Sequence, residues 1–117
     1  MQRLFNSFKF AFCGLFSAIK SEKNLQIHVI ISVLVIIVGI LLKISITEWI
    51  AVLLCIALVI SAELLNSAIE KLSDFVCGEK NSKIGYIKDI SAAAVVVCAI
   101  ISAVVGVMIF LPKLIYG

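Results

Sequence analysis

The sequence predicts an all-α integral membrane protein, with an N-terminal amphipathic interfacial helix followed by three transmembrane helices. Its composition is the first reason, because 63% of its 117 residues are hydrophobic and only 15% are charged. The mean hydropathy is +1.25. A soluble domain of this size cannot hide so much apolar surface, since small domains leave much of their surface exposed. The second reason is three long apolar runs separated by short polar segments, which favours one membrane domain over residues 1–117.

The N-terminal segment, residues 1–24, interleaves basic and aromatic side chains. Phe5, Phe8 and Phe12 recur at helical spacing, and Arg3 and Lys9 lie between or beside them. This pattern is typical of a helix that lies in the membrane interface with its apolar face toward the acyl chains. A capping helix packed on the bundle is the alternative interpretation.

The first two apolar runs predict the first two transmembrane helices. Residues 25–42 are just long enough to cross the hydrocarbon core of a bilayer. Residues 48–75 form the second helix, whose last turns extend beyond the bilayer into the cytoplasm. Trp49 opens this segment, at the depth where aromatic residues anchor helices to the membrane interface.

A hydrophilic segment then separates the second helix from the third. Residues 76–88 are predicted to be a loop, punctuated by Gly78 and Gly85. The third transmembrane helix is predicted over residues 89–111 and is expected to end at Pro112, which cannot continue a regular helix.

The distribution of basic residues predicts the orientation of the helices. Four Lys or Arg residues lie within 1–24 and four more within 71–88, whereas the opposite side has only Lys43 and Lys113. Because cytoplasmic segments carry the excess of Lys and Arg, the N-terminus and the second loop are expected in the cytoplasm. The C-terminus is then expected outside.

Several common site types are missing from the sequence. The four cysteines show no metal-ligand spacing, and they are interpreted as reduced thiols rather than a disulfide framework. There is no phosphate-binding GxxxxGK[ST] motif and no GxGxxG motif. A nucleotide would therefore have to bind through a different arrangement.

The strongest functional signal is a stripe of polar residues on the second apolar segment. Glu63, Asn66, Glu70 and Asp74 are spaced so that all four share one helical face. A carboxylate at the centre of a membrane helix costs about 2.5 to 3.5 kcal/mol on insertion scales. Hydrogen bonds that merely join helices would explain Asn66, but neutral residues would serve that purpose at lower cost than Glu63 and Glu70.

The carboxylate oxygens of this stripe, and the depth of each residue in the membrane, suggest how the stripe could act. Mg²⁺ usually takes one or two carboxylates together with substrate phosphates, and Glu22 and Glu70 could supply that pair. Glu63 lies deeper, where a lipid hydroxyl could reach it. The Glu63 carboxylate could then act as a general base that accepts the proton of this hydroxyl. Lys88 could balance phosphate charge. A lipid-modifying membrane enzyme, a proton-coupled transporter and a structural accessory subunit all remain open at this level.

The order of these motifs resembles the small prokaryotic diacylglycerol kinase family. ELLNSAIEKLSD, which starts at Glu63, resembles the family signature, and KDISAAAVVV, which starts at Lys88, resembles the motif that opens its third span. The N-terminal segment resembles the Gram-positive branch of the family, typically undecaprenol kinase, through Glu22, Asn24 and His28. Cys13 and Gln26 depart from the pattern of that branch, and the His-Pro start of the second loop is missing.

The resemblance implies a lipid kinase of the bacterial cell membrane that transfers the γ-phosphoryl group of ATP to undecaprenol. Diacylglycerol is the alternative acceptor, and a small proton-coupled transporter is the more distant alternative. The family fold implies a homotrimer with active sites shared between subunits. The resemblance also assigns roles to single residues: Glu63 as the catalytic base, Glu22 and Glu70 as Mg²⁺ ligands, and Asn66, Glu70, Lys88 and Asp89 as nucleotide contacts.

Overall fold

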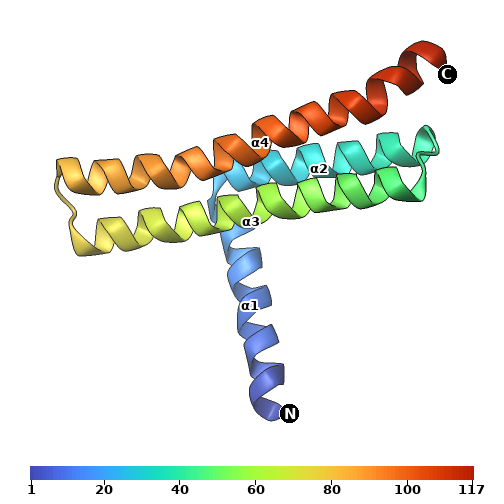
Figure 1. Cartoon of the computed structure of the whole chain (residues 1–117). Helices are drawn as coiled ribbons and strands as arrows, with labels where there is room; N and C mark the ends of the chain where they lie inside the picture. Colours follow the sequence, from blue (N-terminus) through green and yellow to red (C-terminus); the bar gives the residue numbers. More distant parts are fainter.

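A computed structural model describes all 117 residues as four α-helices and their short connections (Figure 1). Three of these helices are long and apolar enough to cross a membrane, which confirms the predicted all-helical protein with three candidate spans. The helices are α1 (Gln2–Ser21), α2 (Lys23–Leu41), α3 (Ile46–Val76) and α4 (Ser82–Tyr116).

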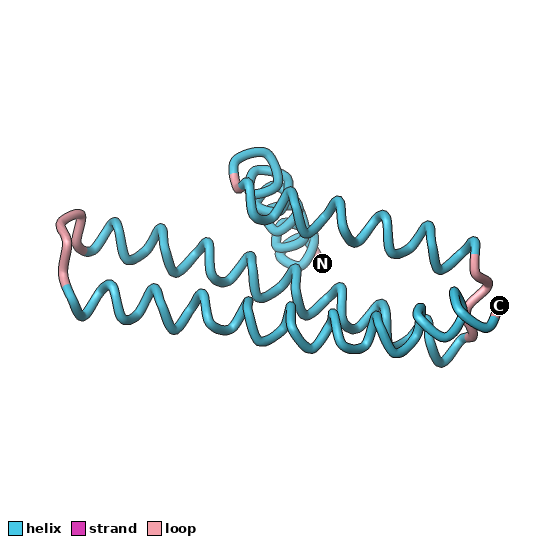
Figure 2. The backbone as a smooth tube through the Cα atoms, turned by 90° about the horizontal axis from the view of Figure 1, so that it is seen from above, coloured by secondary structure: helices cyan, strands magenta, loops and turns pink.

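The three long helices form an antiparallel bundle, and α1 projects sideways from it (Figures 1 and 2). The most extensive contact is between α3 and α4, while α2 packs on α3 and begins partway along it. The ends of α3 and α4 that meet at the 77–81 connection therefore extend beyond the start of α2. The direction of α1, across the bundle, suits a helix that lies along a membrane surface.

A single extended residue separates α1 from α2. The predicted segment 1–24 is not one helix, because α1 ends at Ser21 and Glu22 adopts extended backbone angles. The Gln26 side chain donates hydrogen bonds to the carbonyl oxygens of Ile19 and Lys20, at 2.8 and 3.1 Å. These carbonyls at the helix end lack intrahelical donors, so Gln26 stabilises the corner. The corner holds Glu22 beside α3.

The turn between α2 and α3 is fixed by a capping box. The Ser45 hydroxyl accepts a hydrogen bond from the Glu48 backbone N–H, and the Glu48 carboxylate accepts one from the Ser45 N–H. Glu48 also forms an ion pair with Lys113 of α4 at 3.2 Å. A small apolar core of Ile44, Val52 and Ile109 lies directly beneath. This end of the bundle is therefore tied together by all three long helices.

The predicted loop 76–88 is wrong in length, and so is the predicted end of the last helix. The connection between α3 and α4 covers residues 77–81, because the Asn81 side chain accepts hydrogen bonds from the N–H groups of Lys83 and Ile84 and caps α4. Helix α4 also continues through Pro112 to Tyr116. Pro112 removes one backbone donor, a loss that long membrane helices tolerate.

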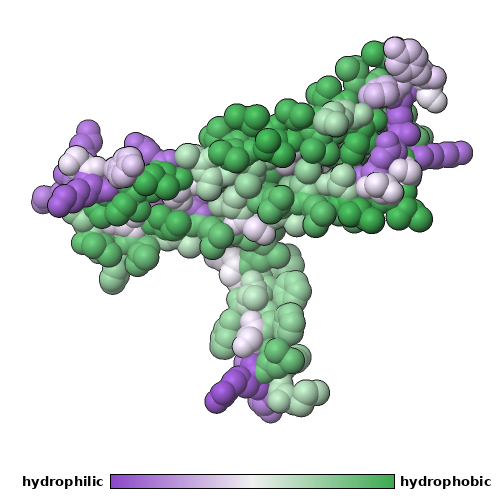
Figure 3. Space-filling model, viewed as in Figure 1, coloured by the Kyte–Doolittle hydropathy of each residue, from purple (hydrophilic) through white to green (hydrophobic).

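Little of the chain is buried within itself. Only 12 of its 117 residues are buried, and five of these are polar or charged. Apolar side chains cover the middle of the bundle, whereas hydrophilic residues gather at its two ends and at the tip of α1 (Figure 3). This pattern is the reverse of a soluble protein and fits a bilayer around the middle of the bundle.

Candidate active site

Glu63 is the most deeply buried ionisable residue of α3. It is 3% exposed, and the chain supplies no hydrogen bond to its carboxylate. The His28 ring of α2 lies opposite, with its Nε2 3.7 Å from Glu63 Oε2. No fully buried polar side-chain atom of the chain lacks a hydrogen-bond partner. The Glu63 oxygens, which accept no hydrogen bond within the chain, therefore keep some access from outside it.

One turn along α3, Asn66 connects two helices through its amide. Its Oδ1 accepts a hydrogen bond of 2.7 Å from the hydroxyl of Ser91 on α4, and both side chains are buried. Its Nδ2 donates to Glu70 Oε1 at 3.3 Å. The amide thus holds one oxygen of the Glu70 carboxylate and leaves the other free. Ser91 is a member of this network that sequence reasoning did not single out.

The two predicted metal ligands take up different positions in a single chain. Glu70 is exposed on α3, while Glu22 is half-buried at the α1–α2 corner. Glu22 Oε1 forms an ion pair with Lys71 Nζ at 3.1 Å, so α1, α2 and α3 meet here. No group of three or more His, Cys, Asp or Glu residues in the chain could hold a metal ion. The chain alone therefore offers separate carboxylates rather than a finished metal cage.

The polar residues at the start of α4 lie beside the end of α3. Lys88 donates a hydrogen bond to the Asp74 carboxylate and forms an ion pair with it. Asp89 is exposed next to it in the sequence. Asp74 and Lys88 border a cavity at the 77–81 connection with a volume of about 470 Å³, which is lined mainly by polar groups. Lys88 is thus a cation at the polar end of the bundle, in line with the stripe on α3.

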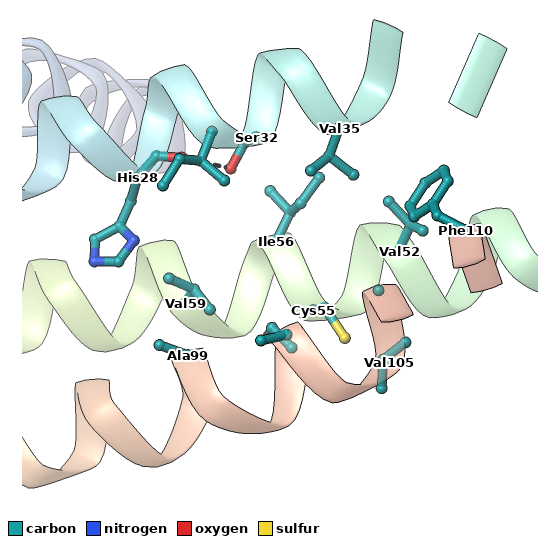
Figure 4. Close-up of a pocket in the computed structure, with 14 residues that line it drawn as sticks. His28, Ser32, Val35, Val52, Cys55, Ile56, Val59, Ala99, Val105 and Phe110 are labelled. Carbon is teal, nitrogen blue, oxygen red and sulfur yellow. Dashed lines mark hydrogen bonds between the residues drawn. The ribbon is translucent and has the colours of Figure 1, made fainter. Parts of the chain in front are cut away.

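A second, apolar cavity lies between α2, α3 and α4 on the other side of Glu63. Its volume is about 320 Å³, and ten of its fourteen lining residues are hydrophobic. His28 lies at one end of it and Phe110 at the other (Figure 4). Glu63 lines neither cavity and lies on α3 between Val59, which lines the apolar one, and Asp74, which lines the polar one. In the sequence, His28 served only to mark the resemblance to the Gram-positive branch, and its position opposite Glu63 was not foreseen.

Comparison with known proteins decides the family. Residues 9–110 match the family described as prokaryotic diacylglycerol kinase. The chain belongs to this family. It is 40% identical to the undecaprenol kinase of Bacillus subtilis over 114 residues, which are 97% of this chain and 93% of that protein. It is 34% identical to a diacylglycerol kinase of Synechocystis over 109 residues, which are 92% of this chain and 62% of that protein.

Membership in the prokaryotic diacylglycerol kinase family confirms the resemblance seen in the sequence motifs and the prediction of a lipid kinase. The match includes the α1–α2 corner, the polar stripe of α3 and the start of α4. The individual roles of Glu22, Glu63, Asn66, Glu70 and the Lys88–Asp89 pair remain predictions.

Proposed function

We propose that this chain is an undecaprenol kinase, which transfers the γ-phosphoryl group of ATP to the terminal hydroxyl of undecaprenol and forms undecaprenyl phosphate. The observation that carries the proposal is Glu63, a buried carboxylate without a hydrogen-bond donor between an apolar cavity and a polar helix end. The identity with the Bacillus subtilis undecaprenol kinase over nearly both full lengths supports this choice of acceptor.

Glu63 acts as the general base in this proposal. The lipid hydroxyl gives its proton to the Glu63 carboxylate as its oxygen attacks the γ-phosphorus. The new O–P bond forms while the bond between the γ-phosphorus and the bridging oxygen of ATP breaks, and ADP leaves. Because phosphoryl transfer needs mainly positioning and charge neutralisation, one base and a few well-placed polar groups are sufficient.

The nucleotide is proposed to contact the polar end of the bundle. Asn66 and Glu70 are held relative to each other by their hydrogen bond, and the Ser91 hydroxyl holds the Asn66 amide from α4. Lys88 lies beside the 77–81 connection, where its ammonium group can turn from Asp74 to a phosphate oxygen. Asp89 completes the set of proposed nucleotide contacts.

The carboxylates of Glu22 and Glu70 have the oxygen donors that Mg²⁺ prefers, and Glu70 keeps one oxygen without a partner. When bound, Mg²⁺ would neutralise phosphate charge and align the phosphates of ATP. The Lys71–Glu22 ion pair must open for Glu22 to act as a ligand, and because the Lys71 side chain is largely exposed, the pair costs little to break.

A homotrimer with shared sites accounts for the separated ligands. Within one chain no cluster of three metal-binding side chains exists, so a neighbouring subunit is proposed to bring Glu22 to a site whose Glu63 belongs to another chain. In the bacterial cell membrane, the N-terminus and the 77–81 connection face the cytoplasm, where ATP is found. The lipid then enters from the side.

A direct test is transfer of radiolabel from γ-labelled ATP to lipid by the purified protein in detergent with Mg²⁺. Undecaprenol and diacylglycerol are offered in parallel. Label mainly on undecaprenol is the expected result. Label mainly on diacylglycerol would keep the chemistry and favour the second candidate, which the identity with the Synechocystis diacylglycerol kinase supports. Folded protein that labels neither lipid would contradict the proposal.

A further inference from the structure

Ser91 differs from three other helical serines in the partner that its hydroxyl takes. The hydroxyls of Ser7, Ser21 and Ser32 each donate to the backbone carbonyl oxygen four residues earlier in their own helix. Serines within helices commonly make this local bond. The Ser91 hydroxyl instead donates from α4 to Asn66 Oδ1 of α3 at 2.7 Å. It therefore joins two helices rather than satisfying its own.

The hydrogen bond from Ser91 to Asn66 lies inside the bundle. Ser91 is 8% exposed and Asn66 is 6% exposed. A buried acceptor that loses its donor bears the full cost of its desolvation. Because so little of either side chain reaches solvent, water is a poor substitute for the hydroxyl. The position of the Asn66 amide therefore depends on Ser91.

The same hydrogen bond helps to fix which way the Asn66 amide faces. With Oδ1 toward Ser91, Nδ2 points to Glu70 and donates to its Oε1 at 3.3 Å. The reversed amide would bring Oδ1 against the Glu70 carboxylate, where two acceptors would meet without a proton between them. The Ser91 hydroxyl and the Glu70 carboxylate thus hold the amide in one orientation from its two ends.

Ser91 is also the fixed contact of this part of α4. It lies three positions after Lys88, so the two side chains share one face of the helix. Both reach α3, where Lys88 pairs with Asp74 and Ser91 with Asn66. The Lys88 pair is partly exposed, and its ammonium group has to move toward a phosphate in the proposed function. The buried Ser91 bond can hold α4 against α3 while Lys88 moves.

We propose that Ser91 is a positioning residue for Mg·ATP, which acts through the Asn66 amide on the Glu70 carboxylate. The amide keeps one Glu70 oxygen engaged, and the other oxygen is presented to the metal. This inference rests on the proposed kinase function and adds to it a residue that touches neither substrate. Because Ser91 acts on Glu70 and not on Glu63, its loss should affect ATP and Mg²⁺ but not the lipid.

Substitutions at Ser91 test the positioning role. Ser91→Ala removes the donor, and we expect an increase of about 3- to 10-fold in the KM for ATP, roughly the worth of one hydrogen bond, with the KM for undecaprenol unchanged. Ser91→Thr keeps the hydroxyl and should recover most of this loss. An unchanged KM for ATP in Ser91→Ala, a rise in both KM values, or equal impairment of the two variants would overturn the assignment.

Ser45→Ala is the matched control, because it removes a serine hydroxyl with one hydrogen bond at the other end of the bundle. It should lower the unfolding temperature through the loss of a helix cap and leave the KM for ATP within about 2-fold of wild type. If Ser45→Ala raised the KM for ATP as much as Ser91→Ala, a general loss of stability would explain both results, and the positioning role would be wrong.

A double variant tests whether Ser91 acts through Glu70. Glu70→Gln removes the charge proposed to bind the metal, so Ser91→Ala should then add little to the Mg²⁺ concentration needed for half-maximal activity. Residues in one hydrogen-bond network show such non-additive effects, whereas the effects of independent sites add in free energy. A Mg²⁺ requirement raised by the product of the two single effects would overturn the proposed path.

Binding without turnover separates this inference from the proposed function. A non-hydrolysable ATP analogue with Mg²⁺ is titrated into purified wild-type and Ser91→Ala protein by calorimetry, with no lipid substrate added. Binding that weakens about 3- to 10-fold in Ser91→Ala supports the positioning role even if the wild-type protein phosphorylates neither lipid. Equal affinities of the two proteins, or a wild-type protein that does not bind the analogue, would overturn the inference.

Discussion

The substitution Glu63→Gln tests the proposed mechanism most sharply, because it changes one proton acceptor and almost nothing else. Glutamine has nearly the same shape as glutamate but cannot take up the proton of the lipid hydroxyl. General base catalysis contributes about 10²- to 10⁴-fold, so turnover should fall by that factor. This loss corresponds to about 3 to 5 kcal/mol of activation free energy. The KM for ATP should change little, because the nucleotide is expected at the polar end.

The structure also predicts how Glu63→Gln affects stability. The carboxylate has no hydrogen-bond donor and no lysine or arginine partner in the chain, and its nearest polar neighbour is His28 Nε2 at 3.7 Å, so an amide loses little interaction there. A charged residue in a membrane helix costs about 2.5 to 3.5 kcal/mol, and the neutral amide avoids most of that cost. The variant should therefore unfold at the same temperature as the wild type or at a higher one, although it is almost inactive.

Glu48→Gln is the matched control, because it makes the same change near the other end of α3. Its carboxylate joins the Ser45 cap and the Lys113 ion pair, so this variant should lose stability and keep its turnover. Lipid phosphorylation and thermal unfolding are measured for both variants in the same detergent. A Glu63→Gln turnover within about 3-fold of wild type would refute the base assignment, since even the weakest general base contributes more.

Three more predictions address the metal, the assembly and the packing. Glu70→Gln should raise the Mg²⁺ concentration needed for half-maximal activity about 10-fold, and an unchanged Mg²⁺ titration would count against a ligand role. Mixed trimers of Glu22→Gln and Glu63→Gln chains should regain activity that neither variant shows alone; verified mixtures that stay inactive would argue for sites within one chain. Gly39→Ala should lower stability by about 1 to 3 kcal/mol without slowing turnover, because its Cβ would lie 2.9 Å from a Trp49 ring carbon. Unchanged thermal unfolding of that variant would contradict the packing.

The number of long helices could be predicted from the sequence, because each apolar run has the length that a bilayer requires. The helix boundaries could not. Gly85 suggested a loop, yet the Asn81 cap lets α4 begin before it. Pro112 suggested a helix end, yet helix α4 tolerates the missing donor and continues to Tyr116. In both cases a local signal was outweighed by a longer helical context.

In the candidate site, the features that lie within one helix could be predicted from the sequence, whereas the contacts between helices could not. The stripe from Glu63 to Glu70 could be predicted because helical periodicity alone puts those residues on one face. Periodicity does not say which residue of α2 packs against that face, so the position of His28 opposite Glu63 was not foreseen. The ion pair between Lys71 and Glu22 depends on the α1–α2 corner in the same way.

The half of α3 near Ser45 mainly stabilises the bundle, whereas the other half carries the residues proposed to take part in the chemistry. Near Ser45 the helix is capped, ion-paired to α4 and packed on an apolar core, so nearly every group has a partner. The other half buries polar side chains, which contributes little to stability and, at Glu63, opposes it. The first half must therefore hold the bundle together while the second keeps an unpartnered carboxylate in place. It follows that substitutions before Val59 should mainly shift the unfolding temperature, whereas substitutions after it should mainly change turnover. The buried polar residues of the second half are Glu63, Asn66, Ser67 and Ser73.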